Sequence, residues 1–148
     1  VAYADEGRLM DAIKVYNQMI DQVPSAEALG NRASVYYKMG AYDRALSDYT
    51  KAIAILPRSA RILTGRGDAH YKKGHYEAAL KDYTQAIKVN KLYYYAYSHR
   101  ANVYRLLKKY SLAQKDYNEA LKLNPYLWEL LPLNKITMKR RLIILHIF

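Results

Sequence analysis

The sequence predicts an all-α fold in which antiparallel helix pairs stack into a solenoid. One helical phrase returns every 34 residues, reading GAYDRALSDYTKAIAILP from Gly40, GHYEAALKDYTQAIKVNK from Gly74 and KKYSLAQKDYNEALKLNP from Lys108. Small and aromatic residues recur within each copy at helical spacing. Since a pair of helices cannot bury its apolar stripe alone, neighbouring copies must stack into one array.

The repeats divide the chain into five segments. A weaker copy, GRLMDAIKVYNQMIDQVP, begins at Gly7, and Val1 then falls in the middle of a helix, so the first repeat is expected to be truncated. We expect the truncated repeat at residues 1–25, full repeats at 26–59, 60–93 and 94–127, and a C-terminal capping helix or tail at 128–148. Each full repeat contains a first helix, a tight turn and a second helix, placed in residues 26–39 and 42–55 of the second repeat.

Glycine marks the tight turn. Gly7, Gly40 and Gly74 share the column in which the first helix must end, because glycine adopts the left-handed C-cap conformation without a steric penalty. Lys108 replaces it in the fourth repeat, at a cost of about 1 kcal/mol if the left-handed geometry is kept.

The second helices carry a stripe of small and aromatic residues. Its columns are Ala12, Ala45, Ala79 and Ala113, then Tyr16, Tyr49, Tyr83 and Tyr117. We interpret the stripe as core packing, and a tyrosine ladder that stacks nucleic-acid bases is the alternative. The sequence Gly65-Arg66-Gly67 is interpreted as a loss of side-chain bulk within a first helix.

An arginine column and an aspartate column also recur every 34 residues. They contain Arg32, Arg66 and Arg100, and Asp48, Asp82 and Asp116. The arginines could form a basic ladder for phosphates or carboxylates. We favour ion pairs with these aspartates between repeats, since each regular column offers the other repeated partners.

These columns resemble the tetratricopeptide repeat family. The residues that carry the resemblance over about residues 1–127 are Tyr36, Gly40, Tyr42, Ala45, Tyr49, Ala52 and Pro57, with their counterparts in the other copies. The family's helix-A tryptophan is replaced by Leu29, Leu63 and Tyr97. The resemblance implies a right-handed superhelical solenoid that acts as a protein–protein interaction scaffold.

The concave face of such a solenoid is lined by the first helix of each repeat, and helical spacing selects its candidate peptide-binding residues. They are Asn31, Ser34, Tyr37, Lys38, Arg61, Asp68, Tyr71, Lys72, Tyr95, His99, Asn102 and Arg105. Their donors and rings suit an extended, acidic peptide of a partner protein.

Two other binding functions are alternatives. A basic repeat protein that associates with RNA fits the net charge of +11, although the same charge also suits acidic peptides or anionic lipid. A co-chaperone-like function resembles the family members that hold the C-terminal carboxylate of heat-shock chaperones. Asn31 and Arg61 match that clamp, but Gly65 stands where its arginine belongs.

Catalytic and cofactor sites are not expected. The chain has no cysteine, its four histidines lack metal-ligand spacing, and neither GxSxG nor a phosphate-binding loop is present. No secretory signal is visible and the longest apolar run is far shorter than a membrane span. We therefore expect a soluble, cytoplasmic protein that is not an enzyme.

The C-terminal segment departs from the repeat pattern. Leu133, Ile136, Ile143, Ile144 and Ile147 fall roughly on one helical side, which favours a helix that caps the last repeat. The alternatives are a basic membrane-surface helix, which would use Lys139, Arg140 and Arg141, and a stretch without stable structure.

Overall fold

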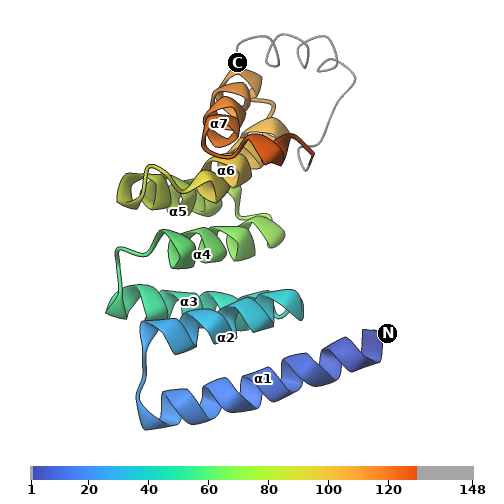
Figure 1. Ribbon diagram of the computed structural model, residues 1–148, viewed down its shortest axis with the longest axis vertical. Helices are drawn as coiled ribbons and strands as arrows, with labels where there is room; N and C mark the ends of the chain where they lie inside the picture. The colour runs from blue at the N-terminus through green and yellow to red at the C-terminus, as the bar shows by residue number, and fades with distance from the viewer. Residues whose placement is uncertain (1, 130–148) are drawn as a thin grey trace.

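The computed structural model describes residues 2–129, and within them it contains only helices (Figure 1). The α-helices are α1 (Ala2–Gln22), α2 (Ala26–Lys38), α3 (Tyr42–Ile55), α4 (Ala60–Lys72), α5 (Tyr76–Val89), α6 (Tyr94–Leu106) and α7 (Tyr110–Leu123). A 3-10 helix, η1 (Pro125–Glu129), follows. The predicted all-α fold class is confirmed.

The helices stack as antiparallel pairs along the long axis of the molecule (Figure 1). The pairs α2–α3, α4–α5 and α6–α7 lie within residues 26–59, 60–93 and 94–127. Within residues 2–129, α2 contacts α4 and α4 contacts α6, whereas α3, α5 and α7 do not contact one another. The first helices are therefore closer together and form the inner side of the curved stack.

The tight turns have the predicted left-handed residues. The φ angles are +75° at Gly40, +76° at Gly74 and +58° at Lys108. In the first turn the N–H of Gly40 bonds the carbonyl of Tyr37, and the next N–H bonds the carbonyl of Tyr36 at 2.9 Å. These two bonds satisfy the last carbonyls of α2. Lys108 keeps this geometry despite its side chain.

The predicted turn at Gly7 is wrong. Helix α1 continues through Gly7, which lacks the positive φ of Gly40 and Gly74. Glycine allows a left-handed turn but does not impose one, and inside a helix it costs only about 1 kcal/mol relative to alanine. Packing of α1 against α2 buries Ile13 and leaves Val15 54% exposed.

The small-residue columns form the interface between paired helices, as predicted. Ala45 and Ala79 are fully buried, and Ala113 is 3% exposed. The two glycines of α4 also leave room for rings, because a Cβ on Gly65 or on Gly67 would lie 2.6 Å from the tyrosine of a neighbouring second helix. The predicted loss of bulk in this helix is confirmed.

The predicted capping helix in residues 133–148 lies outside the described residues. After α7, η1 begins directly and Leu127 is buried. None of the helices in residues 2–129 is both long and apolar enough to cross a membrane.

Candidate functional site

Two side-chain contacts join the first helices of neighbouring repeats on the inner side of the stack. Arg61 of α4 donates from Nη1 to Oδ1 of Asn31 on α2, at 3.3 Å. One repeat later, Nδ1 of His99 on α6 lies 2.7 Å from Oδ1 of Asp68 on α4. Four predicted groove residues are thus brought together in pairs across α2, α4 and α6. We call the inward-facing side chains of these three helices the concave wall.

One column of polar residues on this wall forms hydrogen bonds with tyrosines of the second helices. The column consists of Ser34, Asp68 and Asn102. The Tyr83 hydroxyl donates to Asp68 at 2.7 Å, and the Tyr117 hydroxyl donates to Oδ1 of Asn102 at 2.6 Å. Ser34 also hydrogen-bonds the Tyr49 side chain, but here the serine hydroxyl donates to the phenol oxygen, because the contact lowers the pKa of Tyr49. The same structural task, orienting a tyrosine ring, is therefore performed by a hydroxyl, a carboxylate and an amide in successive repeats.

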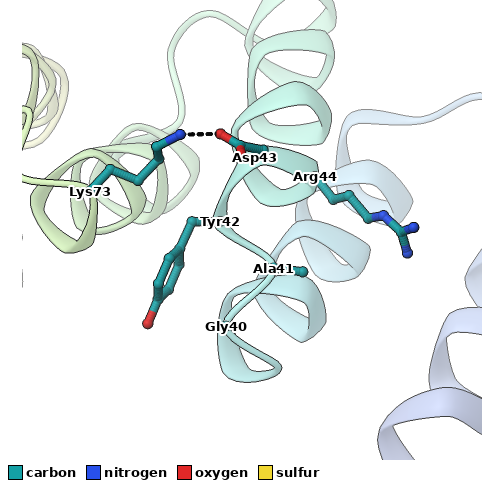
Figure 2. A pocket seen from close by; sticks show the side chains of 6 residues that line it. All are labelled: Gly40, Ala41, Tyr42, Asp43, Arg44 and Lys73. Atoms are coloured by element: carbon teal, nitrogen blue, oxygen red, sulfur yellow. Dashed lines mark hydrogen bonds and ion pairs between the residues drawn. The ribbon is translucent and has the colours of Figure 1, made fainter.

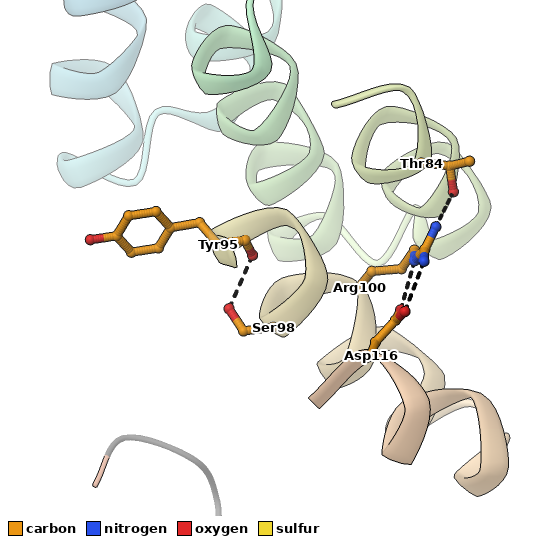
Figure 3. A network of polar contacts seen from close by, with 5 residues as sticks. All are labelled: Thr84, Tyr95, Ser98, Arg100 and Asp116. Atoms are coloured by element: carbon orange, nitrogen blue, oxygen red, sulfur yellow. Dashed lines mark hydrogen bonds and ion pairs between the residues drawn. The ribbon is translucent and has the colours of Figure 1, made fainter. Parts of the chain in front are cut away.

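Aromatic rings extend the wall at α6. The rings of Tyr94 and Tyr95 have centroids 4.1 Å apart, and the Tyr95 ring lies 6.1 Å from the ring of His99. His99 in turn meets the Tyr83 ring edge-on at 6.0 Å. Tyr95 is 44% exposed, and its ring projects from the opposite side of α6 to Arg100 (Figure 3). An accessible aromatic surface thus leads to the Asp68 carboxylate.

Burial and the charge of Asp68 both raise the pKa values of the surrounding phenols. Burial, with a smaller contribution from Asp68, raises the pKa of Tyr37 to about 12 and that of Tyr49 to about 12. Burial also raises the pKa of Tyr83, and Asp68 adds to the shift through its charge and its hydrogen bond. Burial raises the pKa of Tyr93, where Asp68 acts in the same direction and Arg61 opposes it. These tyrosines are therefore neutral at physiological pH.

The remaining predicted residues lie toward the C-terminal ends of the three helices. Tyr37 and Tyr71 are half-buried and pack against the first tyrosine of the following helix, with centroids 5.6 and 6.0 Å apart. Lys38 and Lys72 are exposed last residues of α2 and α4. Arg105 is half-buried, and its Nε is buried without a hydrogen-bond partner among the described residues.

The arginine and aspartate columns form ion pairs behind the wall, and we call each pair an Arg–Asp clasp. The clasps are Arg32–Asp48, Arg66–Asp82 and Arg100–Asp116, each with two bonds of 2.7 to 2.8 Å. The favoured structural role is confirmed, but the expected pairing between repeats is wrong. Helices of one repeat lie closest together, so each carboxylate meets the arginine of its own repeat.

Each arginine still reaches the preceding repeat with its third nitrogen. Nη1 of Arg100 donates to Thr84 on α5 at 3.1 Å (Figure 3), and Nη1 of Arg32 donates to Asn17 on α1 at 2.7 Å. Each clasp therefore holds three helices, and its guanidinium is not available to a ligand.

A small open pocket lies at the turn between α2 and α3. Gly40, Tyr42, Asp43 and Lys73 are among its lining residues, and Lys73 forms an ion pair with Asp43 across it (Figure 2). The pocket shares no residue with the predicted groove. Within residues 2–129, no three histidine or acidic residues are grouped so that they could hold a metal ion.

Sequence reasoning missed the hydroxyls of Tyr83 and Tyr117, which were interpreted only as core filling. The signal was present, because each tyrosine follows a polar groove residue by 15 positions. It also missed Tyr93 and Tyr94, which have no aromatic counterpart in the other repeats.

Known proteins share this fold and part of this sequence. Family models described as tetratricopeptide repeat match residues 24–91 and 64–127. The second TPR of Spaghetti (RPAP3), bound to the HSP90 peptide SRMEEVD, is 33% identical with a TM-score of 0.65, and the match covers 67% of this chain and 92% of that one. The search of curated proteins gave no match.

Two further solved structures are similar to this chain. The second TPR domain of human RPAP3, in complex with the HSP70 peptide SGPTIEEVD, is 34% identical with a TM-score of 0.64 and coverages of 68% and 83%. The Arabidopsis OM64 TPR domain is 26% identical with a TM-score of 0.68 and coverages of 78% and 92%.

Proposed function

The chain belongs to the tetratricopeptide repeat family, and we propose that it is a protein-interaction scaffold that binds an extended peptide of a partner along the concave wall. The observation that carries this proposal is the continuity of the wall. Arg61 bonds Asn31 and His99 bonds Asp68, so donors, acceptors and rings from three helices form one surface. An extended backbone offers donors and acceptors at each residue, and such a surface can pair with several of them.

A chaperone tail is not the partner that we propose, although similar structures carry HSP90 and HSP70 peptides. The resemblance places a clamp arginine in the column of Gly65. In this chain the Tyr49 ring occupies that space, and even a Cβ on Gly65 would lie 2.6 Å from it. Only Asn31 and Arg61 remain from the clamp pattern, which is insufficient to surround a terminal carboxylate.

The proposal is tested by removing the same number of charges from two sides of the molecule. One variant replaces Lys38, Arg61 and Lys72 with alanine, and its control replaces the exposed second-helix residues Lys51, Lys88 and Lys115. Long-range attraction should weaken similarly in both, because their net charges are equal. Only the first variant should lose short-range contacts to the peptide, so its affinity should fall by at least about tenfold more.

The measurement is affinity for peptides selected from a random library by the parent chain, at physiological salt. Equal losses in the two variants would contradict the groove. They would favour the second candidate, an RNA-associated protein, which is supported by the net charge of +11 and would show a steep loss of affinity with salt.

A further inference from the structure

Asp68 is the one acidic residue of the predicted groove, and its charge is not required for its structural contact. Its carboxylate accepts the hydroxyl of Tyr83 at 2.7 Å. In the next repeat the neutral amide of Asn102 accepts the hydroxyl of Tyr117 at 2.6 Å. A neutral acceptor is therefore sufficient to orient the ring, and the negative charge is available for another purpose.

The ion pairs of this carboxylate also differ from those of the buried aspartates. Asp48, Asp82 and Asp116 each receive two bonds from an arginine of their own repeat. Among the described residues, the ion pair of Asp68 is with His99, a group that carries charge only when protonated. Asp68 thus lacks the permanent positive partner that the other three have.

The carboxylate remains open to the groove. The Asp68 side chain is 24% exposed, compared with 5% or less for the clasp aspartates. Tyr83 and His99 both contact Oδ1, and neither contact uses Oδ2. Oδ2 is therefore the oxygen that a ligand could engage without displacing either contact.

Several aromatic side chains lie near this charge. Electrostatic effects of Asp68 reach Tyr37, Tyr49 and Tyr93, which come from α2, α3 and the turn before α6. The exposed ring of Tyr95 lies against His99 on the same side. A carboxylate beside aromatic faces favours a cationic side chain, which gains both an ion pair and contacts between its charge and the rings.

Building on the proposed groove, we infer that the partner peptide places a lysine or arginine side chain against Asp68 at the centre of the concave wall. Arg61 lies about two turns before Asp68 on the same helix, α4, and Lys72 lies at the exposed end of that helix. Acidic residues on either side of the central cation complement these two charges. The ligand is thus a peptide of mixed charge, rather than the extended, acidic peptide expected from the sequence.

The test combines one protein variant with one peptide change. The peptide library is random except for its central residue, which is lysine, arginine, glutamine or glutamate. Peptides are selected from it on the parent chain and on the variant Asp68→Asn. The charge-matched control is Glu77→Gln, on the exposed start of α5. The parent and the control should prefer central lysine or arginine over glutamine by at least about tenfold. The preference should disappear with Asp68→Asn, since asparagine keeps the bond to Tyr83.

Each outcome is decisive. Selected peptides with no preference at the centre, or with a preference that survives Asp68→Asn, would overturn the inference and leave the peptide groove intact. If no peptide is retained, the proposed function fails as well. Replacing lysine with glutamine in a selected peptide tests the parent chain directly, so the result does not depend on how Asp68→Asn folds. Unchanged affinity for the glutamine peptide would overturn the inference.

Discussion

Two regions of the molecule repeat to different degrees. The layer between the paired helices has the same ion-pairing residues in each full repeat, whereas the concave wall changes from one repeat to the next. In the layer, the three Arg–Asp clasps have the same residues and the same two bonds of 2.7 to 2.8 Å. On the wall, the polar column changes from Ser34 to Asp68 to Asn102, although each member bonds its tyrosine. Each clasp holds three helices, so its chemistry is constrained. The wall needs only a hydrogen-bonding group of either charge, so the charge of that group can be used for recognition.

The largest effect should come from breaking a clasp. Asp82→Ala leaves the guanidinium of Arg66, whose side chain is 23% exposed, without the carboxylate that compensates its charge. We expect a loss of about 3 kcal/mol in the free energy of unfolding, measured by urea denaturation.

The control is Asp43→Ala, which removes the ion pair with Lys73 from a side chain that is 83% exposed. Its effect should remain below about 1 kcal/mol, because exposed ion pairs contribute little. Equal losses in the two variants would mean that the clasps are no more important than surface pairs.

A smaller effect is expected at Gly65, where the layer meets the wall. A methyl group there would lie 2.6 Å from the Tyr49 ring, so Gly65→Ala must displace a tyrosine that is 5% exposed. Alanine normally stabilises a helix interior relative to glycine, but overpacking should dominate and cost about 2 kcal/mol.

Gly7→Ala is the matched control for thermal denaturation. No atom lies within 4 Å of a Cβ at Gly7, and the residue is inside α1. This variant should gain about 0.5–1 kcal/mol from helix propensity. A stabilising Gly65→Ala would show that Tyr49 can move freely away from α4.

The sequence predicted the features that depend on local chain geometry. The second helix of residues 42–55 and the left-handed turn at Gly40 follow from helical periodicity and from the conformational freedom of glycine. The turn at Gly7 was predicted wrongly, because glycine permits the left-handed turn without imposing it and is also tolerated inside a helix. Repetition alone therefore overestimates the number of turns.

Features that depend on distances between helices were less predictable. The arginine and aspartate columns were visible, but a 34-residue period does not distinguish pairing within a repeat from pairing between repeats. The predicted groove columns contain Asn31, Arg61, Asp68 and His99, which the structure brings into contact in pairs that the columns did not specify. The peptide-binding role of these residues stays a prediction.

The smallest effect is expected on the wall itself, at the hydroxyl of Tyr117. Tyr117→Phe keeps the ring and removes the bond of 2.6 Å to Asn102, which should cost about 1 kcal/mol. Tyr110→Phe, on a ring that is 64% exposed, is the control and should change stability by less than about 0.5 kcal/mol. A loss for Tyr117→Phe as large as that for Asp82→Ala would place the polar column among the structural constraints. The variation from serine to aspartate to asparagine would then reflect stability instead of recognition, and the comparison between layer and wall would no longer hold.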